Sequence, residues 1–275
     1  MKPLYILPFD HRGSFAKKLL GFEYPPSPTN ALKVVEMKKV VYDGFLQIWS
    51  QHPELQDAMA ILIDLEFGQE IIKDAKEKGI PFALTTEKSG QELFYFQYGD
   101  RFGEQLLKHM PKYAKALVRY NPDEKDKNAA QLNRLKELSN FCKEHQIGFM
   151  FELLVQGESD QLELMTRSLQ QITAHDIAPT LWKVEGLDDG QGWFDIAKHT
   201  QGADIIVLGR GESQDAVEDW LNEAASTQLV SGFAIGRTIF FKPLEQYRDQ
   251  KITREEAVEQ IANNYLHFIN LWQGN

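Results

Sequence analysis

The sequence predicts an α/β fold, a single (β/α)8 TIM barrel that takes in residues 1–275. Short apolar runs alternate eight times with longer helical patterns. Because each parallel return needs a crossover, this alternation indicates a parallel sheet. Eight such units in 275 residues favour a closed barrel. The alternative, an open doubly wound sheet, is disfavoured because no GxxxxGK(S/T) loop is present and Gly209-Arg210-Gly211 lacks a third glycine.

The predicted strands are short and rich in apolar residues, whereas the predicted helices place apolar residues near a 3.6-residue period. The Pro-rich stretch 24–28 falls in the first connection and predicts a loop. The strands are expected at 4–9, 58–64, 81–86, 114–120, 148–155, 180–186, 203–209 and 231–237. The helices are expected at 30–50, 66–79, 99–110, 128–145, the stretch ending at 174, 193–200, 213–225 and 253–272.

Composition narrows the class of protein. The 30 Lys+Arg residues against 40 Asp+Glu give a net charge of −10, which argues against a nucleic-acid partner or an anionic membrane. The single cysteine, Cys142, excludes an intrachain disulfide and fits a reducing compartment. The N-terminal apolar run stops at Asp10, too early for a signal or spanning segment. We therefore expect a cytoplasmic protein.

Strand parity predicts which charged residues point into the barrel, because alternate strand residues face the lumen and the helices. On the fourth strand, an apolar helix-facing set turns Lys115 and Arg119 inward. The same reasoning turns Glu152 inward on the fifth strand, and Lys183 and Glu185 on the sixth. A structural ion-pair network would explain any one of these residues, but their convergence near one end of a barrel favours a site.

This residue set suits Schiff-base chemistry. Asp10 and Asp64 are expected at the ends of the first two strands, beside the luminal lysines. A lysine attacks a ketone as the neutral amine, and burial and a second cation both lower its ordinary pKa of about 10.4. Lys115 would be that cation for Lys183, or the reverse, while Glu185 would act in the opposite direction. Glu152 or Asp10 would carry protons.

Two glycine–arginine pairs follow the last two strands. Gly209-Arg210 ends the seventh and Gly236-Arg237 ends the eighth. Glycine allows close approach of the backbone to an oxyanion, and arginine binds it with a fork of donors. Barrel phosphate sites often use these two loops, so phosphate binding is expected here. The alternative is that the glycines serve tight turns and the arginines are solvated.

A metal-dependent hydrolase or aldolase is the competing enzyme class. It would need histidine ligands at strand ends, but six of the seven histidines fall in or beside helical patterns and only His11 lies near the expected site. Serine or cysteine catalysis lacks support, because there is no GxSxG elbow and Cys142 falls within a helix. We expect no metal and no other cofactor.

Eight motifs resemble a known family in order and over nearly the whole chain. They are PFDHRGSF, IDLEFG, EKSGQELF, AKALVRYNPD, FELLV, LWKVEG, VLGRG and GFAIGRTIF. Together they resemble the 2-deoxy-5-keto-gluconate-6-phosphate aldolase family of myo-inositol catabolism, whose members are often fused to a sugar kinase. They are more distantly similar to class I tagatose-bisphosphate aldolases. The chain departs in two ways: it has no room for a kinase, and Gln156 follows FELLV where a proline is expected.

The resemblance implies a class I aldolase with Lys183 as the imine-forming residue. It implies acid/base or positioning roles for Asp10, Lys115 and Glu152, and it assigns the phosphate to Arg210 and Arg237. The implied substrate, 2-deoxy-5-keto-gluconate 6-phosphate, would give malonate semialdehyde and dihydroxyacetone phosphate. Its carboxylate would be bound by one of three cations: Arg12, Lys88 or Arg119.

Two other functions stay open. The protein could act on another ketose phosphate, or bind sugar phosphates without catalysis; Lys183 separates an enzyme from a sensor, because phosphate binding does not need it. The expected partner is a small sugar phosphate, and the chain could form a homo-oligomer.

Overall fold

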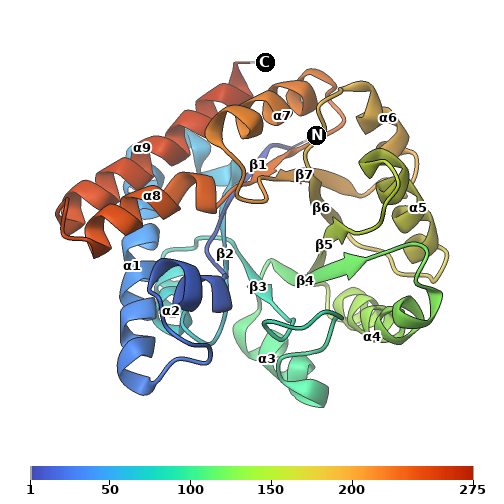
Figure 1. The fold of residues 1–275 in the computed structure, drawn as a ribbon, viewed down its shortest axis with the longest axis horizontal. Helices are drawn as coiled ribbons and strands as arrows, with labels where there is room; N and C mark the ends of the chain where they lie inside the picture. The colour runs from blue at the N-terminus through green and yellow to red at the C-terminus, as the bar shows by residue number, and fades with distance from the viewer. Residues whose placement is uncertain (1, 275) are drawn as a thin grey trace.

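The computed structural model describes residues 2–274, in which eight parallel strands pair in chain order and β1 pairs with β8 to close a barrel (Figure 1). The predicted (β/α)8 barrel is confirmed. The strands are β1 (Leu4–Pro8), β2 (Met59–Ile63), β3 (Phe82–Thr85), β4 (Tyr113–Tyr120), β5 (Gly148–Val155), β6 (Leu181–Glu185), β7 (Asp204–Leu208) and β8 (Gly232–Ala234).

Helices surround the strands, and α9 packs along α1 and α8 at one side of the barrel (Figure 1). No helix within residues 2–274 is long and apolar enough to cross a bilayer. The α-helices are α1 (Pro28–Gln51), α2 (Gln69–Glu77), α3 (Phe102–His109), α4 (Lys125–Glu144), α5 (Gln161–Thr173), α6 (Gln191–Ala197), α7 (Gln214–Ser226), α8 (Arg237–Arg248) and α9 (Arg254–Gln273). Three short helices are η1 (Phe15–Leu19), η2 (Pro53–Ala58) and η3 (Gly99–Arg101).

Side chains of alternating parity fill the lumen and separate it from the larger core between strands and helices. The luminal apolar cluster includes Ile6, Leu62, Met150, Leu181 and Ile206. Since successive strand residues point to opposite faces, the same parity continues along each strand toward its carboxyl end. The charged residues predicted to face inward follow these apolar positions, so the luminal orientation is confirmed for Lys115, Glu152 and Lys183.

One helix was missed by the sequence prediction. The eighth strand was expected at 231–237 with the next helix at 253–272, but β8 ends at Ala234 and α8 begins at Arg237. Pro243 lies inside this helix and removes the backbone donor that would bond to the carbonyl of Ile239. Asn264 of α9 donates its side-chain amide to that carbonyl at 2.8 Å, so the neighbouring helix satisfies the freed group.

A buried ion pair joins α1 to the ends of β1 and β2. Lys38 of α1 is fully buried and pairs with Asp64, while its Nζ also donates to the carbonyl oxygen of Phe9 at 2.5 Å. The second Asp64 oxygen accepts from the backbone N–H of Phe67 at 2.9 Å. Asp64 was expected beside the luminal lysines, but it instead holds the β2–α2 turn and pairs with Lys38, which binds the Phe9 carbonyl just before Asp10.

We predict that Lys38→Met lowers the free energy of unfolding by about 3–5 kcal/mol, because it leaves the buried Asp64 carboxylate without its cation. Urea unfolding followed by circular dichroism measures the change. The matched control is Lys39→Met, which removes a partly exposed lysine paired with Glu70 and should cost less than about 1 kcal/mol. Equal losses in both variants would contradict the anchoring role of Lys38.

Candidate active site

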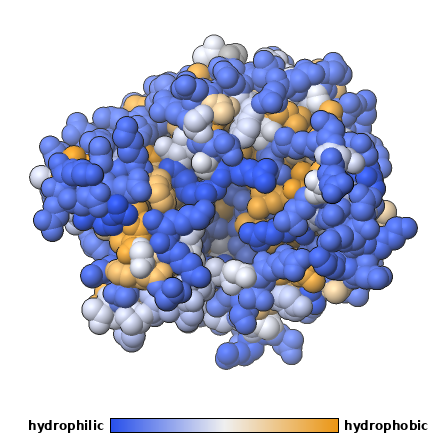
Figure 2. Space-filling model, in the orientation of Figure 1, coloured by the Kyte–Doolittle hydropathy of each residue, from blue (hydrophilic) through white to orange (hydrophobic). Residues whose placement is uncertain are grey.

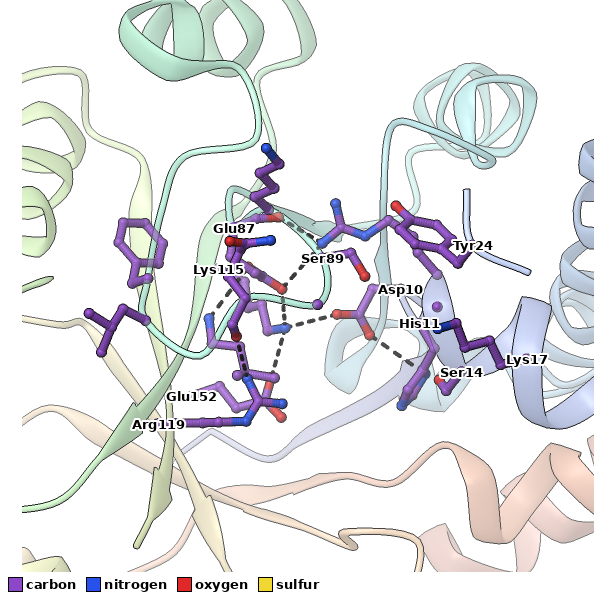
Figure 3. Close-up of a pocket in the computed structure, with 18 of the residues that line it drawn as sticks. Asp10, His11, Ser14, Lys17, Tyr24, Glu87, Ser89, Lys115, Arg119 and Glu152 are labelled. Atoms are coloured by element: carbon purple, nitrogen blue, oxygen red, sulfur yellow. Dashed lines mark hydrogen bonds and ion pairs between the residues drawn. The ribbon is translucent and has the colours of Figure 1, made fainter. Parts of the chain in front are cut away.

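The ammonium group of Lys115 lies among three carboxylates (Figure 3). Its Nζ lies 2.9 Å from Asp10 Oδ2, 2.7 Å from Glu87 Oε1 and 2.8 Å from Glu152 Oε2. Asp10 lies just after β1, Glu87 lies just after β3, and Glu152 belongs to β5. Three parts of the barrel therefore converge on one lysine. The Lys115 side chain is 1 % exposed. The contacts with Asp10 and Glu87 are hydrogen bonds, and the contact with Glu152 is an ion pair.

Glu152 connects the two luminal lysines. Its Oε1 lies 2.8 Å from Nζ of Lys183, and its Oε2 lies 2.8 Å from Nζ of Lys115. The contact with Lys183 follows from the sheet, since the two residues are register partners across β5 and β6. The sequence predicted that each lysine would act on the other as a neighbouring cation. The structure places a carboxylate between them, which offsets that repulsion.

Charge–charge attraction decides the protonation of this cluster. Burial opposes the charge on Lys115, but the surrounding carboxylates outweigh burial and raise its pKa well above its ordinary value. Burial also opposes the charges of Asp10 and Glu152, yet Lys115 holds the pKa of each below its ordinary value. At neutral pH, Lys115 is therefore an ammonium group, and Asp10 and Glu152 are carboxylates.

A cavity of about 400 Å³ opens onto these groups. Figure 2 shows the face of the molecule hollowed near its centre, with mostly hydrophilic residues around the hollow. Asp10, Glu87, Glu152, Lys115 and Lys183 all line the cavity. Its other basic lining residues come from the loop after β1, the loop after β3 and the end of β4. They are Arg12, Lys17, Lys18, Lys88 and Arg119.

A second cavity of about 450 Å³ adjoins the first at Lys18, which lines both. It is lined by Gly211 after β7 and by Arg237 and Thr238 at the start of α8. The Arg237 guanidinium donates to the carbonyl oxygen of Arg210. A Cβ on Gly211 would lie 2.4 Å from Arg237 Cζ, and Gly211 has a φ of +83°, so this contact requires glycine.

A family profile described as "Uncharacterized protein conserved in bacteria (DUF2090)" matches residues 1–275. The chain belongs to the DUF2090 family. No curated protein matches the sequence significantly. The family description states no activity, so the resemblance of this DUF2090 protein to 2-deoxy-5-keto-gluconate-6-phosphate aldolases stays a prediction.

Solved structures share the fold at low sequence identity. A structural-genomics target from Corynebacterium glutamicum (Brevibacterium flavum) has a TM-score of 0.63 and 17% identity, covering 96% of this chain and 85% of that one. An archaeal fructose 1,6-bisphosphate aldolase has a TM-score of 0.61 and 11% identity, covering 100% and 94%. A further archaeal fructose-1,6-bisphosphate aldolase structure has its catalytic Lys covalently bound to a carbinolamine intermediate; its TM-score is 0.59 at 10% identity, covering 98% and 93%.

The predicted phosphate residues of this DUF2090 protein do not all lie in one place. Arg237 lines the second cavity, whereas Arg210 Nη1 lies 2.5 Å from Glu185 Oε1. Glu185 was expected to act on Lys183, but its other oxygen accepts from the backbone N–H of Val155, and burial raises its pKa.

The glycines of the two predicted phosphate-binding pairs differ in how much space surrounds them. A Cβ on Gly209 would make only ordinary van der Waals contacts, whereas a Cβ on Gly236 would lie 2.3 Å from the Pro8 carbonyl oxygen. Gly236 is therefore required by packing against β1.

The cations predicted to bind the substrate carboxylate differ in burial and in the hydrogen bonds they already make within the protein. Arg12 is buried and donates to the Glu87 carbonyl oxygen at 2.7 Å and to Gln97 Oε1 at 3.2 Å. Arg119 donates to the Gln91 carbonyl oxygen at 3.2 Å. Lys88 is exposed at the cavity. Lys88 and Arg119 are thus better placed than Arg12 to meet an added anion.

Sequence reasoning gave no site role to Glu87 and none to His11 beyond that of a metal ligand, and both line the cavity. Glu87 was passed over because it follows β3 in a loop, where strand parity does not apply; its position just beyond a strand end was the available signal. His11 was considered only as a metal ligand. Burial lowers its pKa to about 4, opposed by Asp10 and reinforced by Arg237, so its imidazole is neutral at pH 7. Within residues 2–274, no group of three potential ligand residues could hold a metal ion.

We predict that this protein loses stability between about pH 6.5 and pH 4 because of His11. Its folded pKa lies below its ordinary value of 6.5, so the unfolded chain takes up the proton first as pH falls. His11→Asn should flatten this decline by about 3 kcal/mol, measured as urea unfolding free energy against pH. The steeper loss below about pH 4, where the unfolded chain takes up protons at Asp10 and Glu152 before the folded protein does, should persist. An unchanged slope above pH 4 would contradict the assignment.

Proposed function

We propose that this protein is a class I aldolase that cleaves a ketose-type sugar phosphate through an imine on Lys183. One observation carries the proposal: Lys183 lies on a cavity wall in an ion pair with Glu152, while the neighbouring Lys115 is surrounded by carboxylates. A nucleophile with an adjacent acid/base is the arrangement that covalent catalysis by lysine requires. The fold is shared with a Schiff-base-forming fructose-1,6-bisphosphate aldolase and with an archaeal aldolase whose catalytic Lys is bound to a carbinolamine, which agrees with this proposal.

The surroundings of the two lysines favour Lys183 as the nucleophile. Imine formation needs a neutral amine with a free electron pair. The raised pKa of Lys115 keeps its nitrogen protonated. Lys183 needs to pass one proton to Glu152, whose Oε1 is already 2.8 Å away, to become reactive.

The proposed reaction proceeds in balanced steps. The Lys183 amine adds to the substrate ketone to give a carbinolamine, and Glu152 returns a proton to the departing hydroxyl, which leaves as water. In 2-deoxy-5-keto-gluconate 6-phosphate, the imine forms at C5, and a carboxylate then removes the C3 hydroxyl proton. The C3–C4 bond breaks, its electrons enter the iminium to give an enamine, and malonate semialdehyde is released. Protonation and hydrolysis of the enamine release dihydroxyacetone phosphate.

Phosphate binding at the second cavity fits the same substrate class. Arg237 and Lys242 both line that cavity, and Arg237 lies where the turn after β7 meets α8. Loops after the last two strands and the start of a following helix are common phosphate sites in barrels. A sugar phosphate with its ketone at Lys183 would extend past Lys18 toward Arg237.

A screen of several ketose phosphates with product identification tests which substrate is cleaved, and cleavage of none of them would contradict the proposal.

We predict that borohydride with dihydroxyacetone phosphate attaches the ligand to the peptide containing Trp182-Lys183-Val184. Peptide mass spectrometry locates the label. Lys183→Arg should lose label and turnover while still folding, because arginine keeps the charge but forms no imine. Label on Lys115 would exchange the proposed roles of the lysines, and complete absence of label with retained sugar-phosphate binding would favour a sensor.

We predict that Arg237→Ala raises the KM for a phosphorylated substrate about tenfold or more, since a charge-assisted contact is worth roughly 1.5–3 kcal/mol. Steady-state kinetics give KM and kcat separately. The control is Lys251→Ala, an exposed lysine paired with Asp249, which should leave both constants unchanged. An unchanged KM in Arg237→Ala would place the phosphate elsewhere.

A further inference from the structure

Glu87 is the one carboxylate around Lys115 to which neither the sequence nor the proposed mechanism gives a role. It is 8% exposed and lines the cavity at the end of β3. Its Oε1 lies 2.7 Å from Lys115 Nζ, and its Oε2 accepts from the backbone N–H of Leu117 at 3.4 Å. Both oxygens are therefore directed at β4, the strand that carries Lys115.

The backbone on both sides of Glu87 is fixed. The N–H and hydroxyl of Thr86 both donate to the Lys115 carbonyl oxygen at 2.9 Å, which ties the preceding residue to β4. The N–H of Lys88 donates to the Tyr95 carbonyl oxygen at 2.8 Å. Glu87 itself forms an antiparallel bridge with Phe96. Although it lies outside a strand, Glu87 is held about as firmly as a strand residue.

Arg12 supports Glu87 from the other side. Its Nη2 donates to the Glu87 carbonyl oxygen at 2.7 Å and lies 3.8 Å from Glu87 Oε1. Arg12 itself is buried, and Glu87 is the leading charge that raises its pKa against the effect of burial. Glu87 thus interacts with a cation on each side, which offsets the cost of burying its own charge.

The charges of the cluster balance only when Glu87 is counted. Three carboxylates, on Asp10, Glu87 and Glu152, face three cations, on Arg12, Lys115 and Lys183. The Lys115 ammonium donates side-chain hydrogen bonds to Asp10 and Glu87 and forms an ion pair with Glu152, so Glu87 accepts one of its two side-chain hydrogen bonds. With all three contacts made, release of a proton from Lys115 would leave three carboxylates around a neutral amine, without their shared cation.

We propose that Glu87 is a positioning residue that, supported by Arg12, holds Lys115 as a permanent ammonium and so reserves imine formation for Lys183. The role rests on the proposed aldolase function and deepens it. A cationic Lys115 keeps Glu152 as a carboxylate, ready to accept the Lys183 proton. Glu87 acts through Lys115 and is not required to touch substrate.

The test measures the reactivity of Lys115 directly, without any turnover. Formaldehyde with borohydride methylates only neutral amines, and peptide mass spectrometry gives the extent at each lysine between pH 8 and pH 10. In the unaltered protein, Lys115 should react more slowly than Lys183 throughout this range. In Glu87→Gln, Lys115 should react faster, about tenfold for each unit by which its pKa falls. Glu87→Asp should restore much of the protection, because it restores the charge.

The control Glu92→Gln removes an exposed carboxylate that pairs with Lys127 and should change neither Lys115 reactivity nor turnover. Equal Lys115 reactivity in Glu87→Gln and the unaltered protein, both folded by circular dichroism, would overturn the proposal. If Glu87→Gln does not fold, the comparison of Lys115 with Lys183 in the unaltered protein decides, and equal rates there would overturn it.

Turnover gives a second readout. Glu87→Gln should lower kcat with little change in KM and should move the alkaline limb of the kcat profile to lower pH, because the loss of a neighbouring negative charge lowers the Lys115 pKa. The groups facing Lys115 are Asp10, Glu87 and Glu152. If no ketose phosphate forms an imine while Lys115 reactivity still depends on Glu87, the aldolase function fails and the electrostatic effect of Glu87 stands. If an imine forms at Lys183 but the reactivity of Lys115 does not depend on Glu87, the aldolase function stands and the proposed role of Glu87 fails.

Discussion

The carboxylate of Glu152 lies between two buried ammonium groups, and the arrangement of the site depends on that contact. Each of its oxygens is 2.8 Å from a lysine nitrogen, on Lys115 and on Lys183. Removing either lysine would leave a buried charge without one partner, which is costly in a protein interior. The barrel supplies this geometry, because β4, β5 and β6 are consecutive strands whose register brings the three side chains to one end of the lumen.

The same contact makes two chemically similar residues unequal. Lys115 is held as a cation by three carboxylates, whereas Lys183 contacts one carboxylate, that of Glu152. A permanent cation beside an amine that can be deprotonated is useful to an imine-forming enzyme, since one supplies fixed charge and the other supplies a nucleophile. The apolar luminal cluster fills the rest of the barrel, so the open space beside the lysines is the cavity at the strand ends.

Much of this fold and site was predictable from the sequence, because both depend on periodic patterns. Alternation of strands and helices gave the barrel, and parity along β4, β5 and β6 placed Lys115, Glu152 and Lys183 in the lumen. Parity cannot describe residues beyond a strand end. Asp64 has the luminal parity of Leu62, yet the chain turns after Ile63 and Asp64 pairs with Lys38.

The remaining surprises depend on contacts between segments far apart in the chain. Lys38 lies among apolar positions of α1, and its partner lies 26 residues away. The helix α8, which was not predicted, contains Pro243, and Asn264 of α9 satisfies the carbonyl that this proline leaves without a backbone donor. Glu87 required knowledge of where the loop after β3 returns to β4. None of these partners is visible in a local pattern.

The most direct test of the central claim is a crystal structure of the protein reduced with borohydride in the presence of a ketose phosphate. The account predicts continuous density from Lys183 Nζ to the former carbonyl carbon, with Glu152 in contact with the adduct and Lys115 still among its three carboxylates. Density joining the ligand to Lys115, or a bound sugar phosphate with no bond to either lysine, would contradict it.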